Sequence, residues 1–377
     1  MMKMKIMFIL RSVAYKNGTE RTITDKVNSL AQMGNIVTLV TYEQGRHPFA
    51  FQINPLVHII DLNCRYFTLY KYPLPIRFIK SWEMKSRFKR KIHDLVDELN
   101  PDVVSTPTYT AEYMKAIMSL KKKTRIVIES HTAFTHDMEG GTLVERIGKY
   151  FLLKTIKRCD LLIALTKGDA ICWQKHVKNV VSVRNPVTYY PEQIDKSKKL
   201  EGRILSVGRL QPQKRMDRLI AAFSMIADKY PSWFIDIYGD GEDENKLKDQ
   251  VKQLGLECRV NFKGTTSDTY KEYLTSQFLV LSSDYEGYGL VLIEAMACGL
   301  PVISTNCPFG PSEIIKSDVD GLLAKMDIED LADKMEWMIT HEEGRKEMGN
   351  NAHHSASRYR KENVMKEWEK AYMSLIE

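Results

Sequence analysis

Two glutamates stand out in the stretch DYEGYGLVLIEAMACGLPVI, residues 284–303. Glu286 precedes an apolar helical pattern, and Glu294 lies within that pattern after seven intervening residues. A carboxylate taken out of water without a partner costs several kcal/mol, so Glu294 must meet either a protein group or a ligand. Neutral hydroxyls such as a ribose diol would suit its acceptor oxygens, and a buried ion pair with Lys or Arg is the alternative. Both remain open at this point.

A second group of residues is cationic. The strand pattern RILSVG leads into RLQPQK and the helical pattern MDRLIAAFSMI, which places Arg209 in the turn and Lys214 just before the helix. The N–H groups and the dipole at a helix start favour anions, so these cations predict a diphosphate site. Two surface cations without a ligand are the alternative. Gly289 offers a further close approach to backbone N–H groups, at the start of the helix that carries Glu294.

The elements that must position these groups alternate between short apolar runs and amphipathic helical patterns. This alternation is typical of a parallel sheet wrapped by helices. Strands are predicted at KIMFIL, NIVTLVTY, PDVVST, RIVIES and CDLLIALT, and then at RILSVG, WFIDIYGDG, VNFKG, FLVLSSD and PVISTN. In such sheets ligands bind beyond the carboxyl ends of the strands.

A polar, proline-bearing segment near residues 185–200 separates the two series of strands. We therefore predict an α/β protein with two Rossmann-like parallel-sheet domains facing across a cleft. The predicted domains are residues 1–190 and 200–358, and a final helix, 359–377, is expected to return to the first domain. Helices are expected to begin near Met216, Asp243, Thr269, Gly289 and Glu329, and Thr166 with Asp169 forms a plausible capping box for another.

Composition narrows the class of protein. The 377 residues are 44% hydrophobic and 27% charged, as in a globular enzyme. The six cysteines form no Cys-x-x-Cys pair, which favours reduced thiols and a cytoplasmic location. No run of about eighteen apolar residues predicts a membrane span, and the apolar run at the N-terminus is too short for a signal peptide.

The net charge of +7 is unevenly placed, because residues 71–91 hold eight Lys/Arg against one Glu. If this segment is helical from about Ile76, one stripe carries Phe78, Trp82, Ile92 and Val96, interrupted by Lys85 and Lys89. A basic face mixed with aromatic residues favours contact with an anionic membrane surface, which would make the protein peripheral at the inner face of the membrane. A solvated helix on the outside of a domain is the alternative.

Several motifs together resemble one family. VGRLQPQKRMDRLIAAF, YGDGEDENKL, VNFKG, DYEGYGLVLIEAMACGLPVIST and CPFGPSEII occur in the order and at the spacing of the nucleotide-sugar half of retaining GT-B glycosyltransferases, family 4. The resemblance covers nearly the whole chain and is strongest over residues 202–324.

The resemblance implies roles for the residues singled out above. Arg209 and Lys214 would bind the donor diphosphate and stabilise the leaving nucleotide as charge develops on it. Glu286 would hold the hydroxyls of the transferred sugar, and Glu294 would bind the ribose. The implied donor-binding set is completed by Gly18, Gly239, Tyr288, Gly289 and Leu290.

In the first domain, the glycine-rich loop of the family matches KNGTER, residues 16–21. Asn17 stands where the family usually has a glycine, next to Gly18. The resemblance also places a catalytic histidine after RIVIES, at His131. The spacing of His131, His136 and Asp137 matches no common metal site. Asp318-Val319-Asp320 lies in a turn that the family places away from the diphosphate, so we predict neither a metal nor a cofactor.

The expected activity is transfer of a sugar from a nucleoside-diphosphate donor to an acceptor hydroxyl, with retention of configuration. UDP-hexose or UDP-N-acetylhexosamine is the expected donor, GDP-mannose is the runner-up, and a saccharide or lipid-linked acceptor of surface glycan assembly is the expected acceptor. A non-catalytic nucleotide-sugar sensor of the same fold is a further alternative. An NAD-dependent dehydrogenase is disfavoured because no Gly-x-Gly-x-x-Gly follows the first strand. No nucleic-acid partner is expected, because Glu286 and Glu294 would repel phosphate backbones.

Overall fold

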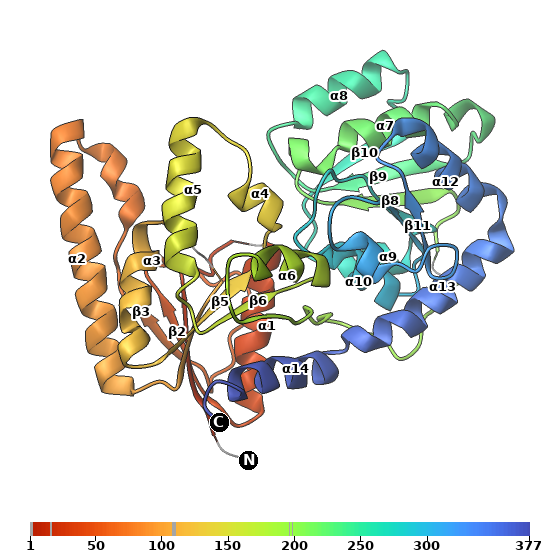
Figure 1. Ribbon diagram of the computed structural model, residues 1–377. Coiled ribbons are helices and arrows are strands. Elements are labelled where there is room, and N and C mark those ends of the chain that lie inside the picture. Colours follow the sequence, from red (N-terminus) through yellow and green to blue (C-terminus); the bar gives the residue numbers. More distant parts are fainter. Residues whose placement is uncertain (1–2, 16, 108–110, 196, 198) are drawn as a thin grey trace. The chain divides into compact units, whose positions relative to one another are not determined.

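The computed structural model describes residues 3–15, 17–107, 111–195, 197 and 199–377. The chain divides into two compact units (Figure 1). Unit 1 comprises Met1–Arg184 and Glu362–Glu377, and unit 2 comprises Asn185–Lys361. The sequence analysis placed these boundaries at residues 190–200 and at 358/359, whereas the two units divide after Arg184 and after Lys361.

The described part of unit 1 is built on a seven-stranded parallel sheet in the order β3-β2-β1-β4-β5-β6-β7. The strands are β1 (Lys5–Leu10), β2 (Ile36–Thr41), β3 (His58–Asp61), β4 (Val103–Thr106), β5 (Arg125–Ser130), β6 (Leu161–Ala164) and β7 (Val180–Ser182). The helices are α1 (Gly18–Gln32), α2 (Leu74–Leu99), α3 (Ala111–Met118), α4 (Phe134–Met138), α5 (Leu143–Ile156), α6 (Lys167–Gln174) and α14 (Lys361–Met373), with 3₁₀ turns η1 (Tyr66–Lys71) and η2 (Ser119–Lys122).

Strand residues of unit 1 alternate between two helical layers. Met7, Val104 and Ile128 belong to one core with residues of α2, α3 and α6. Phe8 points the other way, where its ring meets Tyr372 of α14. Because side chains alternate along a strand, Glu129 of β5 faces the layer that contains α1 and α14.

The described part of unit 2 is built on a six-stranded parallel sheet in the order β10-β9-β8-β11-β12-β13. The strands are β8 (Arg203–Val207), β9 (Phe234–Tyr238), β10 (Val260–Gly264), β11 (Phe278–Leu281), β12 (Val302–Thr305) and β13 (Gly321–Ala324). The helices are α7 (Met216–Ser224), α8 (Glu244–Gln253), α9 (Thr269–Leu274), α10 (Leu290–Ala297), α11 (Pro311–Ile314), α12 (Ile328–Thr340) and α13 (Glu342–Ala356), with 3₁₀ turns η4 (Pro212–Lys214), η5 (Ala227–Lys229) and η6 (Ser357–Tyr359).

The predicted strands are confirmed, as is the prediction of two Rossmann-like parallel-sheet domains. The sequence analysis did not identify the edge strands β3, β7 and β13, which have three or four residues each. Strands of similar length such as β4 and β6 are fully buried, whereas β3 and β7 are exposed or half-buried and lack the pattern of a buried apolar run.

The predicted stripe on α2 changes from exposed to buried along the helix. Ile92 and Val96 are buried, but Phe78 and Trp82 are exposed. The reason is length. A helix of 26 residues spans about 39 Å, whereas a strand of six residues spans about 20 Å, so one end of α2 must project beyond the sheet.

Candidate functional site

In each unit, the strand order shows where along the carboxyl edge of the sheet ligands are expected to bind. In unit 2 the order reverses between β8 and β11, and in unit 1 between β1 and β4. Loops that leave the carboxyl ends of such neighbouring strands diverge and open a crevice. Arg209 and Lys214 follow β8, and Glu286 follows β11, so three predicted site residues lie at the reversal point of unit 2.

Hydrogen bonds tie these two loops of unit 2 together. The hydroxyl of Ser282 donates to the carbonyl oxygens of Lys214 and Arg215, at 2.9 Å each. The side-chain amide of Gln213 donates to the carbonyl of Tyr285 over 2.8 Å. The loop after β8 is therefore fixed to the loop after β11 on both sides of Lys214.

Lys214 and Glu286 form an ion pair within this frame. Lys214 Nζ lies 2.7 Å from Glu286 Oε1, which also accepts a hydrogen bond of 2.6 Å from Ser283 Oγ. Glu286 is only 6% exposed. An ammonium group has three N–H donors, so Lys214 can hold Glu286 and still donate to an anion. The pair thus offers a cation and a carboxylate acceptor side by side.

Contacts of Arg215 and Arg218 with Asp284 stabilise the same turn. Arg218 Nη2 lies 2.6 Å from Asp284 Oδ1, and Arg218 Nη1 donates to the carbonyl of Ser282. Arg215, whose φ of 48° is left-handed, also reaches Asp284 at 3.2 Å. These contacts support the backbone that carries Lys214 and Glu286.

Arg209 is exposed in the loop after β8, and Gly239 supports that loop from β9. Gly239 has a φ of +142°, and a Cβ there would lie 1.9 Å from the carbonyl oxygen of Gly208. The backbone of the loop is held by Gly208 N–H to Tyr238 O and by Leu210 N–H to Asp240 O. Glycine is therefore required at 239 because the backbone of the Arg209 turn lies against it.

The helix start after Glu286 also uses left-handed backbone. Gly289, with a φ of 93°, is the N-cap of α10, and Leu290 is its first residue. A Cβ at Gly310, in the CPFGPSEII segment, would lie 2.5 Å from the carbonyl oxygen of Tyr288. The loop before α11 thus packs against the loop that carries Glu286.

Glu294 is 5% exposed and accepts a hydrogen bond of 2.9 Å from the hydroxyl of Tyr273, a residue of α9. Burial, and then the charge of Glu294, raise the pKa of Tyr273 well above its usual value, so that hydroxyl remains a donor. One protein partner of Glu294 is thus a neutral hydroxyl.

In unit 1, His131 follows β5 and its imidazole contacts a buried carboxylate. His131 Nε2 lies 3.0 Å from Glu129 Oε2, and Lys26 of α1 forms an ion pair with the same oxygen. The other oxygen accepts hydrogen bonds from Ser105 and from Tyr372 of α14, at 2.7 and 2.9 Å. Both Lys26 and Glu129 are fully buried.

This network fixes the charges around His131. Burial alone would raise the pKa of Glu129, but Lys26 and the hydrogen bond from His131 outweigh it and hold that pKa well below its usual range. Burial lowers the pKa of His131, and the contact with Glu129 offsets only part of that effect. His131 is therefore neutral near pH 7. An ionised Glu129 requires the proton on Nε2, which leaves Nδ1 as an acceptor.

Gly18 is the first residue of α1, directly after β1 and its loop. Asn17 is the N-cap of this helix, with extended backbone (φ −116°), and its side chain accepts from the N–H of Glu20 at 2.9 Å. The asparagine therefore caps the helix in a conformation that any residue can adopt. Lys16 of the KNGTER segment lies outside the described residues.

The predicted capping box at α6 takes a different form. Thr166 caps the helix by accepting from Asp169 N–H. The carboxylate of Asp169 accepts instead from Phe134 N–H at 2.7 Å and from Ser130 Oγ at 3.1 Å, which ties α6 to the loop that begins with His131. Burial raises the pKa of Asp169 to about 6.

Sequence reasoning missed Ser283, Tyr273, Lys26 and Glu129. Glu129 could have been found, because it stands in the apolar strand RIVIES and the argument used for Glu294 applies to it. Ser283 adjoins Glu286 but has no distinctive pattern. Tyr273 and Lys26 meet their partners over 21 and 103 positions in sequence, and no local spacing marks such contacts.

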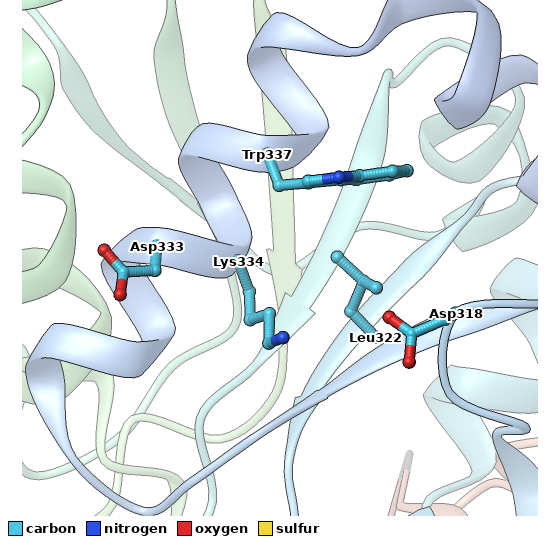
Figure 2. A pocket seen from close by; sticks show the side chains of 5 residues that line it. All are labelled: Asp318, Leu322, Asp333, Lys334 and Trp337. Carbon is cyan, nitrogen blue, oxygen red and sulfur yellow. The ribbon is translucent and has the colours of Figure 1, made fainter.

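One cavity of unit 2 lies apart from these loops. It has a volume of about 210 Å³ and is lined by Asp318, Leu322, Asp333, Lys334 and Trp337 (Figure 2). Asp318 precedes β13, so this cavity lies at the amino end of that strand, opposite the carboxyl edge. Lys334, Leu322 and Trp337 turn toward a common space, whereas Asp333 points away. Asp320 of the Asp-x-Asp sequence accepts from Lys316 N–H at 2.7 Å, which commits one of its oxygens to the turn.

Among the described residues, no group of three or more His, Cys, Asp or Glu is placed to hold a metal ion. The expectation of a metal-independent reaction remains a prediction. No helix in the described part of the chain is long and apolar enough to cross a membrane.

Comparison with known proteins places this geometry in a family. Residues 191–355 match the model of Glycosyl transferases group 1, and residues 16–188 match that of Glycosyltransferase Family 4. An uncharacterized glycosyltransferase of Haemophilus influenzae is 31% identical over 97% of this chain and 98% of its own. The chain therefore belongs to the glycosyltransferase family that these two models describe.

Two further likenesses involve proteins with named ligands or substrates. The Campylobacter jejuni GalNAc-α-(1→4)-GalNAc-α-(1→3)-diNAcBac-PP-undecaprenol α-1,4-N-acetyl-D-galactosaminyltransferase is 27% identical over 97% of both chains. A mutant of S. aureus TarM, solved in complex with fondaparinux, α-GlcNAc-glycerol and UDP, superposes with a TM-score of 0.77. It covers 98% of this glycosyltransferase and 100% of its own chain at 14% identity, a likeness of fold, GT-B.

Proposed function

We propose that this glycosyltransferase transfers a hexose or N-acetylhexosamine from a UDP-sugar to a saccharide or lipid-linked acceptor in surface glycan assembly. The observation that carries the proposal is the Lys214–Glu286 pair at the reversal point of the unit 2 sheet. A cation fixed beside a carboxylate acceptor suits a ligand that presents phosphate next to sugar hydroxyls.

In the proposed reaction, Arg209 and Lys214 neutralise the charge that develops on the leaving diphosphate. Glu286 accepts hydrogen bonds from the transferred sugar, and Glu294 accepts them from the ribose. The acceptor oxygen attacks on the same face from which the diphosphate departs, and the leaving phosphate takes its proton, so the configuration is retained. No side chain is assigned as a covalent nucleophile, and no metal is assigned a role.

In the proposed mechanism, His131 interacts with a sugar hydroxyl. With its proton on Nε2, its Nδ1 can accept a hydrogen bond from a neutral hydroxyl but cannot donate to a phosphate. We therefore assign it to the binding and positioning of a sugar hydroxyl. The undecaprenol-linked substrate named for the Campylobacter relative supports a lipid-linked acceptor here.

The first test is thermal unfolding with UDP, GDP or NAD, each in chelator-treated buffer. A ligand at about a hundred times its Kd stabilises the folded state by about 2.7 kcal/mol, enough to raise the Tm by a few degrees. UDP alone should raise it. A shift with GDP alone would redirect the donor assignment to GDP-mannose, and a shift with NAD alone would contradict the proposal.

The second test separates an enzyme from a nucleotide-sugar sensor. A panel of UDP-sugars is incubated with saccharide and undecaprenol-linked acceptors, and ¹H NMR of the product gives its anomeric configuration. Retention is expected, with turnover unchanged by a chelator. An inverted product would overturn the retaining mechanism, whereas UDP binding without turnover on any acceptor would favour the sensor.

A further inference from the structure

Unit 1 exposes large apolar side chains on the first turns of two helices. On α2 these are Leu74, Ile76, Phe78, Ile79 and Trp82, and on α5 they are Leu143, Val144, Ile147, Tyr150 and Phe151. Phe78 and Trp82 are 74% and 69% exposed, and Leu143 and Val144 are 73% and 79% exposed. We call this set the two-helix surface.

The side chains of the two-helix surface lie in register along each helix. Leu74, Phe78 and Trp82 are four residues apart, as are Leu143, Ile147 and Phe151, and this spacing places each trio on one helix face. On α2 this trio continues the stripe of the buried Ile92 and Val96 toward the N-terminus, beyond the part of the helix that packs on the core, and on α5 only Ile156 is buried. The exposed part of each stripe therefore does not contribute to holding these helices in unit 1.

The fold brings the two stripes to one edge of unit 1. The chain enters α2 after β3, and it enters α5 after β5 and the short helix α4. Helices that connect parallel strands run back along the sheet, so their N-terminal turns lie at the carboxyl edge. α3 packs against both helices, and Figure 1 shows the N-terminal ends of α2 and α5 at the same end of the unit. His131 and Gly18 follow strands of this same sheet at the same edge.

Basic side chains border the apolar stripes. Residues 71–91 carry eight Lys/Arg against one Glu, and residues 142–158 carry five against one Glu. Both glutamates have local partners: Glu83 lies 2.8 Å from Lys80, and Glu145 accepts from Thr142 in the N-terminal capping box of α5. The surface therefore joins exposed aromatic and aliphatic groups to an excess of positive charge.

We propose that the two-helix surface docks on an anionic membrane, with the apolar side chains entering the headgroup region and the lysines and arginines contacting lipid phosphates. An amphipathic helix with large apolar residues on one face and basic residues beside them has this physical behaviour. A second copy of the chain is the less suitable occupant, because two such surfaces would bring like charges together. The sequence marked only residues 71–91, and α5 supplies a second inserting stripe.

This docking deepens the proposed function, because it holds the carboxyl edge of unit 1 at the bilayer, where a lipid-linked acceptor resides. Its test does not depend on catalysis. The natural chain is mixed with vesicles of phosphatidylcholine containing increasing phosphatidylglycerol, at 0.1 M and 0.5 M NaCl. Trp82 is the exposed tryptophan, since Trp173 and Trp368 are fully buried and Trp233 and Trp337 are partly buried. Its fluorescence therefore reports insertion.

We expect binding that grows with phosphatidylglycerol content and weakens at high salt, because the longer Debye length at low salt preserves the attraction. Tryptophan emission should shift to shorter wavelength on binding, and lipids brominated on their acyl chains should quench it. The Trp82→Phe variant should bind as well as the natural chain but lose the shift. Equal affinity for neutral and anionic vesicles, or binding without any shift, would overturn the proposal.

Paired substitutions test each helix separately. Phe78→Ser with Trp82→Ser, and Leu143→Ser with Phe151→Ser, should each weaken vesicle affinity by about tenfold or more while leaving the Tm unchanged. Met225→Ser with Leu254→Ser is the matched control, because both side chains are exposed in unit 2. Vesicle affinity unchanged in both test pairs would contradict the assignment. A concentration-dependent dimer that the test pairs disperse, with no vesicle binding, would give the surface to a second copy.

UDP binding distinguishes the failure of this proposal from the failure of the proposed function. The paired variants should keep the full Tm shift with UDP, because Lys214 and Glu286 belong to unit 2. If the paired variants lose vesicle binding but keep the Tm shift with UDP, the result supports the membrane-docking surface and, separately, the donor site.

Discussion

The imidazole of His131 donates to a carboxylate, Glu129, that residues of β4, α1 and α14 also hold. Lys26 reaches the carboxylate from α1, and Tyr372 reaches it from α14. The ammonium of Lys26 lies 3.1 Å from the ring centroid of Trp368, so the same helix also covers the cation. The orientation of His131 therefore depends on residues that are far apart in the sequence.

Glu129→Gln should destabilise the protein by about 3–5 kcal/mol, because it leaves the charge of Lys26 buried without its partner. The measurement is chemical denaturation of the variant beside the natural chain. Asp97→Asn is the matched control: it breaks an exposed pair with Lys123 and should cost less than about 1 kcal/mol. Adding Lys26→Met to Glu129→Gln should recover part of the loss. Equal costs for the buried and exposed pairs would contradict this account.

The pKa of His131 in the folded state should lie below its ordinary value, because burial disfavours the charged imidazolium. The unfolded chain takes up this proton near pH 6.5, so the contribution of His131 to stability decreases as the pH falls below that value. Imidazole ¹H–¹⁵N spectra report both the charge and the protonated nitrogen, and His131→Gln identifies the signal. A His131 signal that titrates at or above pH 6.5, or a proton on Nδ1, would refute the proposed state.

Asp169 should show the opposite pH dependence. Its pKa is raised from 3.8 to about 6 by burial, so ionisation costs stability as the pH rises from about 4 to 6. The two values differ by about two pKa units, which corresponds to about 3 kcal/mol. Relative to the natural chain, Asp169→Asn should therefore become more stable at pH 7 than at pH 4.5. Calorimetric Tm values at the two pH values measure this difference, and a constant offset would disprove the raised pKa.

Lys214→Ala should lower kcat by about 10²–10³-fold, the usual cost of removing one group that stabilises charge in a transition state. The readout is turnover with the UDP-sugar that the donor panel identifies. Lys248→Ala is the matched control, because Lys248 pairs with Glu244 on the exposed face of α8. Lys214→Arg should restore part of the rate if charge is what matters. A kcat within a few-fold of the natural enzyme would remove Lys214 from the mechanism.

Gly239→Ala should disrupt the turn that presents Arg209, since its Cβ would meet the Gly208 carbonyl at 1.9 Å. We expect a loss of several kcal/mol in stability or of the UDP-induced Tm shift. Gly255→Ala is the control: its φ is also positive, at +68°, but nothing lies within 4 Å of the added Cβ. The control should cost only about 1–2 kcal/mol of backbone strain. Identical effects of both substitutions would show that strain alone explains Gly239.

The fold was predictable to the extent that each element has a local pattern. The strands RILSVG and FLVLSSD are apolar runs bounded by polar or glycine residues, and the pairing of β8 with β11 brings their following loops together. Residue types and spacing singled out Arg209, Lys214 and Glu286 in those loops, and the resemblance to the family then implied their roles. Periodicity likewise predicted a helix after residue 71, but it did not show how far this helix would extend beyond the sheet.

The rest of the candidate site depends on contacts that sequence spacing does not encode. Tyr273 reaches Glu294 because α9 packs against α10, and Tyr372 reaches Glu129 from a helix more than two hundred positions away. For a similar reason, the sequence indicated only the α2 part of the two-helix surface. Residues 71–91 are conspicuously basic, whereas the apolar residues of α5 resemble those of any buried helix until its neighbours are known.

The position of α14 bears on how the chain acquires its structure during synthesis. Residues 1–184 leave the ribosome before Trp368 and Tyr372, which cover Lys26 and bond Glu129. Unit 1 therefore cannot reach its final packing before the whole of unit 2 has been made. A fragment ending at Arg184 should then bind a separate peptide of residues 362–377, and a fragment that ignores this peptide would show that the first unit matures alone. If the peptide binds, nascent unit 1 must wait with an unfinished core while unit 2 folds.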